Sequence, residues 1–249
     1  MYQIRLFFAA LIYFTRIPSP INIGHTPDQL NRAVRYFPLV GLIVGSIAAL
    51  AYYGAIRLFS RETAVLISMI ASILLTGAFH EDGFSDFCDG FGGGWSRERI
   101  LEIMRDSRIG VFGAIGIGSM LALKYHMLLE LNQNKLMPLL IAAHGLSRLF
   151  PVWVASAIPY ARDPGQFKPT ASNPTKLELL IASIFGLGPL LYFGPTILFP
   201  AIAATLAATA MALYVRRWIG GYTGDCMGAI QQVTEIVFYS TAVAFWTFM

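Results

Sequence analysis

The residues best suited to chemistry lie in one short acidic segment of an otherwise apolar chain. Between Glu81 and Asp89, four of the fourteen Asp and Glu residues fall within nine positions. If this segment is helical, Asp82, Asp86 and Asp89 stand at i, i+4 and i+7 and project within about 60° of one another. Such carboxylates repel each other unless a cation lies between them, and Mg²⁺ prefers oxygen ligands of this kind. We therefore predict that Asp82, Asp86 and Asp89 bind Mg²⁺, with an ordinary solvated helix end as the alternative.

His80 precedes this segment directly. An imidazole changes its protonation state near neutral pH, so His80 is a candidate general base or a hydrogen-bond partner for a substrate. A purely structural imidazole near the membrane surface is an equally good interpretation. Glu81 points about 100° away from Asp82 on a helix, so we expect it to have a structural role.

The arginine-rich segment 95–110 supplies a second group of candidates. Its narrow apolar stripe predicts a short amphipathic helix at the membrane surface. We predict that Arg105 and Arg108 bind phosphate, because a planar guanidinium group donates two parallel hydrogen bonds to phosphate oxygens. Arg97 and Arg99 are expected instead to pair with nearby acidic residues or to face lipid headgroups.

A glycine-rich loop from Gly220 to Asp225 is the third candidate. Glycines that expose consecutive backbone N–H groups form concave anion sites, which suit phosphate. We predict that Gly221, Thr223 and Asp225 contact substrate, and that Asp225 binds a metal ion or a ribose hydroxyl. The glycines alone are a weak signal, which the acidic and arginine-rich segments strengthen.

Composition places the chain among integral membrane proteins. Hydrophobic residues make up 56% of it and charged residues 13%, and several apolar runs approach the roughly 20 residues that cross a bilayer. We predict one all-α membrane domain over residues 1–249, with about seven transmembrane helices and a retained N-terminal interfacial helix over residues 3–15. The predicted spans are 37–58, 63–79, 111–129, 136–158, 178–194, 197–215 and 233–249, and the stretch 178–215 is open to a different division.

Lys and Arg predict the orientation, because cytoplasmic loops retain positive charge. With the N-terminus inside, most of the eighteen Lys and Arg residues fall on the cytoplasmic side. This arrangement brings the acidic segment together with the loops 159–177 and 216–232. The net charge of +4 is accounted for by these loops facing anionic membrane lipid, so we expect no nucleic acid partner.

Two features inside the predicted spans concern helix packing. His144 and Arg148 are ionisable groups at membrane depth, which predicts a polar interior for the helix bundle. Gly41 and Gly45 form a Gly-xxx-Gly pair that permits close helix contact, either within one chain or between chains. Formation of a homo-oligomer is therefore left open.

Taken together, three separated motifs resemble the adenosylcobinamide-GDP ribazoletransferase, or cobalamin synthase, family. They are His80-Glu81-Asp82-Gly83 with Asp86 and Asp89-Gly90, then Arg105-Asp106-Ser107-Arg108-Ile109-Gly110, then Gly220-Gly221-Tyr222-Thr223-Gly224-Asp225. Glu81 departs from the apolar residue that is frequent there in the family. The resemblance implies a Mg²⁺-dependent transferase on the cytoplasmic face of a bacterial inner membrane. Its substrates would be adenosylcobinamide-GDP and α-ribazole or its 5′-phosphate, and GMP would be released.

The resemblance also implies roles for these residues. Asp82, Asp86 and Asp89 would hold Mg²⁺ against the pyrophosphate, and Asp89 or His80 would accept the proton of the attacking hydroxyl.

Two other functions are weighed against this one. A CDP-alcohol phosphotransferase-like lipid synthase also uses aspartates on a helix, but its motif continues with Ala-Arg, which is absent after Gly83. A cation transporter would need an ionisable relay, and apart from His144 and Arg148 the predicted spans contain few ionisable residues.

Overall fold

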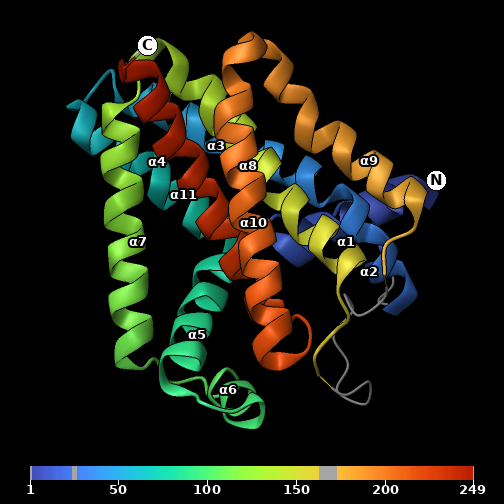
Figure 1. Ribbon diagram of the computed structural model, residues 1–249. Helices are drawn as coiled ribbons and strands as arrows, with labels where there is room; N and C mark the ends of the chain where they lie inside the picture. Colours follow the sequence, from blue (N-terminus) through green and yellow to red (C-terminus); the bar gives the residue numbers. More distant parts are fainter. Residues whose placement is uncertain (1, 24–26, 163–172, 249) are drawn as a thin grey trace.

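The computed structural model describes residues 2–23, 27–162 and 173–248, and these fold into helices (Figure 1). The predicted all-α class is confirmed. The α-helices are α1 (Tyr2–Phe14), α2 (Pro27–Ala33), α3 (Phe37–Ala55), α4 (Arg61–Thr76), α5 (Phe79–Gly93), α6 (Arg97–Ile103), α7 (Val111–Glu130), α8 (Gln133–Ala157), α9 (Lys176–Leu187), α10 (Leu198–Ile219) and α11 (Gly224–Phe248). Two 3-10 segments, η1 (Val34–Tyr36) and η2 (Gly188–Ile197), join their neighbours. Most of the loop 159–177 lies outside the described residues.

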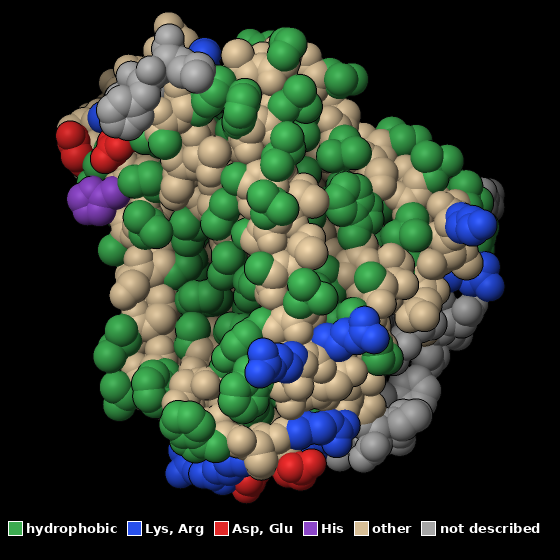
Figure 2. Space-filling model, viewed as in Figure 1, with side chains coloured by type: hydrophobic (Ala, Val, Ile, Leu, Met, Phe, Trp, Pro, Cys, Tyr) green, Lys and Arg blue, Asp and Glu red, His purple; other side chains and the backbone are tan. Residues whose placement is uncertain are grey.

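Several of these helices are long and apolar enough to cross a bilayer, so the chain is a multi-pass membrane protein. In the described part of the chain the candidates are Gln29–Ala55, Val111–Glu130, Gln133–Ala157 and Lys176–Ile219. The bent pair α4 and α5 makes a fifth if it is counted as one span. Figure 2 shows hydrophobic side chains over α7, α9 and α10, and Lys and Arg near the end where α6 lies. The predicted number of seven spans is not confirmed.

The candidate spans differ from the predicted ones because the backbone bends at two places. Gly77 and Ala78 both have left-handed backbone conformations, with φ of 67° and 58°, so α4 stops and α5 leaves it at an angle of 87°. Gly194 breaks the run Lys176–Ile219 with φ of 65° and ψ of −160°. On either side of this break α9 and α10 run in opposite directions (Figure 1).

The last predicted span is the second half of α11, which is not among the candidate spans of the described residues. The helix carries the polar residues Gln231, Gln232 and Glu235 near its middle, and all three are buried. The helix packs mainly against α5, α10 and α8. A polar helix at this place is stable only if its polar groups find partners within the protein.

Those partners form a buried charged cluster. The Lys124 Nζ of α7 lies 2.5 Å from the Glu235 Oε1, and both side chains are less than 5% exposed. The Gln231 amide donates to the other oxygen of Glu235 at 2.6 Å. On α8, the Arg148 guanidinium lies 2.9 Å from the His144 Nδ1, which is 3.7 Å from Glu235.

The predicted polar interior is therefore confirmed, and it is larger than His144 and Arg148 alone indicated. Lys124 also belongs to this interior, because it lies within α7 and is buried there. The spans therefore contain more ionisable residues than the argument against a cation transporter assumed. That argument was wrong and no longer weighs against this function.

Gly41 and Gly45 allow α3 to pack along α8 within one chain. A Cβ on Gly41 would overlap the carbonyl oxygen of His144, and one on Gly45 would lie 2.8 Å from the Ile141 Cα. The close contact permitted by this glycine pair is thus made between two helices of the same molecule.

We predict that Gly41→Ala lowers the free energy of unfolding by about 1–3 kcal/mol, because α3 and α8 must separate to admit the methyl group. Gly54→Ala on the same helix is the matched control, since a Cβ there would have no neighbour within 4 Å. Thermal unfolding in detergent micelles compares the two variants. Equal midpoints would contradict this account of the α3–α8 contact.

Candidate functional site

The acidic segment forms helix α5, so the helical spacing predicted for its carboxylates is confirmed. Asp82, Asp86 and Asp89 share one side of the helix, but their surroundings differ. Asp82 is exposed, Asp86 is half-buried and Asp89 is buried. Within the described residues, no group of three His, Cys, Asp or Glu side chains is placed to hold a metal ion. The three carboxylates therefore share a face without converging on one point.

Asp89 is occupied by backbone amides. Its two carboxylate oxygens accept hydrogen bonds from the N–H groups of Gly110 at 2.7 Å and Gly113 at 2.8 Å. Gly110 is the N-cap residue of α7, and because glycine has no side chain it cannot supply a capping oxygen itself. Asp89 therefore supplies the cap from α5, and its negative charge faces the positive end of the α7 dipole. This contact fixes α7 to α5, and it leaves the predicted metal-binding and proton-accepting roles of Asp89 untested.

On another side, α5 touches the beginning of α11 backbone to backbone. A Cβ on Gly83 would lie 3.1 Å from the Asp225 Cα, and one on Gly228 would lie 3.1 Å from the His80 carbonyl oxygen. Asp225 consequently lies next to the turn of α5 that carries Asp82. Two of the three motifs found in the sequence meet at this contact.

Asp225 forms an ion pair that the sequence did not reveal. Its Oδ2 lies 2.7 Å from a guanidinium nitrogen of Arg162, which is 9% exposed. The segment before Arg162 is held to the glycine-rich loop by two backbone bonds. Tyr222 N–H donates to the Pro159 carbonyl, and Ala161 N–H donates to the Tyr222 carbonyl. A single arginine in a loop carries no sequence signal for such a pairing, although its charge and the nearby acidic motif are compatible with it.

Gly221 and Thr223, both predicted to contact substrate, have structural roles in the described structure. A Cβ on Gly221 would overlap the Pro159 carbonyl oxygen, so glycine is needed where the two loops touch. Thr223 is fully buried, and its hydroxyl accepts the N–H of Cys226 in the first turn of α11. Their contact with substrate stays a prediction that this placement does not support.

The arginine-rich segment divides into structural and exposed members. Arg97 donates to the carbonyl oxygens of Ile219 at 3.1 Å and Ala161 at 2.8 Å, and thereby ties α6 to the glycine-rich loop and its neighbour. This contact was not predicted, although Arg97 also lies 4.0 Å from Glu98. Arg99 pairs with Glu102 at 2.8 Å, as predicted.

Arg105 and Arg108, the predicted phosphate ligands, are both exposed. Arg108 pairs with Asp106 at 2.6 Å, and the hydrogen bonds from Arg108 lower the pKa of Asp106 to about 2. Arg105 lies close enough to Tyr160 to influence its hydroxyl electrostatically.

A cleft of about 700 Å³ opens between α5, α6 and the start of α7. Its polar lining includes Asp89, Arg99, Asp106 and Arg108. This volume is typical of sites for substrates and cofactors. The cleft lies where α5 meets α7, whereas Asp225 lies where α5 meets α11.

His80 is buried below the acidic face, with 2% of its surface exposed. Its ring centroid lies 5.5 Å from that of Phe37 and 5.3 Å from that of Phe79. Its Nε2 has no hydrogen-bond partner among the described residues. A substrate would have to displace aromatic rings to reach it, so its role as a general base stays a prediction and the structural interpretation is favoured.

The chain is similar to proteins of known activity over nearly its whole length. Residues 6–243 match the family model described as cobalamin-5-phosphate synthase. An adenosylcobinamide-GDP ribazoletransferase of Ralstonia nicotianae is 46% identical, covering 98% of this chain and 96% of the relative. Proteins with the same name from Vibrio cholerae, at 41% identity over 98% and 95% of the two chains, and from Leptospira biflexa, at 38% over 98% and 97%, are similar as well. No solved structure matches the chain.

We predict that Asp89→Ala lowers the free energy of unfolding by about 1–3 kcal/mol, because two amide donors at the start of α7 lose their acceptor. Asp82→Ala, at an exposed position of the same helix, should change it by less than about 0.5 kcal/mol. Unfolding is followed in detergent without metal or substrate. A loss of stability in Asp82→Ala equal to that in Asp89→Ala would contradict the capping role.

Proposed function

The chain belongs to the cobalamin-5-phosphate synthase family, and from this premise we propose that it is an adenosylcobinamide-GDP ribazoletransferase. The enzyme transfers the adenosylcobinamide-phosphate group from adenosylcobinamide-GDP to α-ribazole or its 5′-phosphate and releases GMP, which is the last step of cobalamin assembly. The observation that carries the proposal is the 46% identity over nearly the full length of a relative with this name. The acidic face of α5 beside Asp225 supports it, because transfer at a pyrophosphate requires charge neutralisation and positioning.

Mg²⁺ fits the exposed part of this acidic face. Asp82 and Asp86 are one helical turn apart on α5, exposed and half-buried respectively, and Mg²⁺ takes one or two carboxylates together with substrate phosphate and water. Asp82 and Asp86 would therefore hold the ion. Asp89 is buried and accepts two amide hydrogen bonds. When bound, Mg²⁺ would neutralise charge on the pyrophosphate and on the departing GMP.

The side chains around this face would position the reacting groups. Arg105 and Arg108 bind phosphate oxygens, and the buried pair of Arg162 and Asp225 places a carboxylate where a ribose hydroxyl can donate to it. The ribose oxygen attacks the phosphorus that is bound to cobinamide, and the bond from this phosphorus to the GMP oxygen breaks. The hydroxyl proton passes to a carboxylate of the acidic face, and GMP leaves with the electrons of the broken bond.

The proposed active face is cytoplasmic, in a bacterial inner membrane. Arg97, Arg105 and Arg108 accompany the acidic face, and Arg216 and Arg217 end α10 near the same loop. Positive charge of this kind marks the cytoplasmic side. Nucleotide substrates are found on that side of the membrane, which supports the same orientation.

We expect purified protein in lipid nanodiscs to release GMP from adenosylcobinamide-GDP only when α-ribazole and Mg²⁺ are both present. Chromatography of the nucleotides measures the release, with excess chelator as the control. Release without α-ribazole would indicate hydrolysis, and no release from folded protein would contradict the proposed function.

Asp86→Asn should lower kcat by about 100-fold or more, because it removes charge that stabilises the metal and the transition state. Thermal unfolding in detergent verifies that the variant is folded. Glu102→Gln is the matched control, since Glu102 is an exposed carboxylate paired with Arg99 on α6. Full activity of Asp86→Asn, or an equal loss in Glu102→Gln, would remove Asp86 from the metal site.

A further inference from the structure

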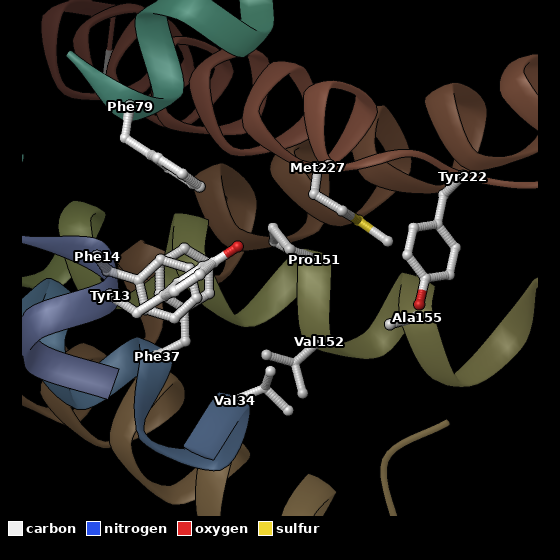
Figure 3. A pocket seen from close by; sticks show the side chains of 11 residues that line it. Tyr13, Phe14, Val34, Phe37, Phe79, Pro151, Val152, Ala155, Tyr222 and Met227 are labelled. Carbon is white, nitrogen blue, oxygen red and sulfur yellow. The ribbon is translucent and has the colours of Figure 1, made fainter. Parts of the chain in front are cut away.

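A small aromatic pocket opens beside the proposed site (Figure 3). It is formed where five helices meet, because α1 and α3 face α8 across it while α5 and α11 close its remaining sides. Its principal side chains are Tyr13, Phe14, Phe37, Phe79, Tyr222 and Met227. None of these residues has a part in the phosphate chemistry described above.

The pocket lies next to the acidic face of α5, which contributes Phe79 to its lining. Phe79, Asp82 and Asp86 stand at i, i+3 and i+7, so they lie on the same side of the helix. The carboxylates begin one turn beyond the aromatic ring of Phe79, and Asp86 is about 10 Å from it along the axis. At its other side the pocket is lined by Gly224, which is bonded directly to Asp225.

We propose that this pocket binds the aromatic base of the ribazole substrate, so that its ribose lies against Asp225 and the acidic face. The inference rests on the proposed function, which supplies the substrate. It adds the place and the groups by which the acceptor is recognised.

The chemistry of the lining fits this base better than the guanine of the other substrate. The base of α-ribazole is a dimethylated benzimidazole, which has apolar edges and a single free ring nitrogen. The pocket is almost wholly apolar, and its side chains provide two hydroxyl groups, those of Tyr13 and Tyr222. Figure 3 shows the Tyr13 hydroxyl directed into the pocket. Guanine would leave several donors and acceptors without partners there, at about 1–3 kcal/mol for each group.

The size of the pocket sets how deeply the base enters. The cavity volume is about 60 Å³, several times the roughly 10–15 Å³ that one water molecule needs on this measure. It accepts the methylated end of the ring system, and the remainder stacks at the rim. Phe79 is 40% exposed at that rim, so part of its ring surface is available to stack against the base.

The first test fills the pocket from α8. Ala155 lines it, and Ala155→Phe should raise the KM for α-ribazole at least tenfold while the KM for adenosylcobinamide-GDP stays within about twofold. The matched control is Ala157→Phe, an exposed position on the same helix that lines a different groove, and its two KM values should equal those of the native protein. Free dimethylbenzimidazole should inhibit the native enzyme competitively against α-ribazole, and at least tenfold more weakly in Ala155→Phe.

A second variant covers the case in which Ala155→Phe does not fold. Phe79→Ala removes a partly exposed ring, and it should raise the KM for α-ribazole several-fold with no change in the other KM. An unchanged KM for α-ribazole in a folded pocket variant, or a rise confined to adenosylcobinamide-GDP, would overturn the inference. These results all require GMP release by the native protein, so they differ from failure of the proposed function, in which no GMP is released at all.

Discussion

The backbone contact between α5 and α11 is the constraint on which the site depends. Gly83 and Gly228 let the two helices approach until the Asp225 Cα and the His80 carbonyl oxygen lie only 3.1 Å from where a Cβ on each glycine would be. Gln232 of α11 also donates to Glu81 of α5 at 2.8 Å. The acidic face, the glycine-rich loop and the aromatic pocket are adjacent because these helices touch. A larger residue at Gly83 would separate the carboxylates of α5 from Asp225 without altering any of them.

A polar helix can occupy the middle of this bundle because its charges are balanced. The buried cations Lys124 and Arg148 are matched by the buried anions Glu81 and Glu235. Each charge alone would cost about 2.5–3.5 kcal/mol at the centre of a membrane on insertion scales. Their pairing joins α7 and α8 to α11, and it thereby holds α11 where α5 can reach it. This structural role explains the charged cluster without any ion transport. The family relationship also indicates an enzyme and not a transporter.

Features that depend on local spacing could be predicted from the sequence, and features that depend on long-range contacts could not. The helix through Asp82 and Asp86, the short helix near residues 3–15 and the family resemblance follow from patterns of neighbouring residues. The pairing of Lys124 with Glu235 joins residues far apart in the chain, and so does that of Arg162 with Asp225. No local pattern encodes either one.

Asp89 also shows that local spacing does not reveal contacts with a distant helix. Its spacing from Asp86 correctly indicated a shared helix face, but its amide partners, Gly110 and Gly113, belong to another helix. The predicted number of spans is likewise not confirmed in the described residues. Hydropathy records apolar length and does not record the left-handed backbone at Gly77 and Ala78 that turns the chain.

The most direct test of the account is to locate the divalent cation relative to α5 and α11. Fe²⁺ in place of Mg²⁺ generates hydroxyl radicals that cleave the nearest backbone, and mass spectrometry identifies the cut positions. The account predicts cuts near Asp82 and Asp86 and near Asp225, from two helices that meet only in the folded protein. Cuts confined to residues 106–113, around the cleft beside Asp89, would place the ion at α7 and contradict it.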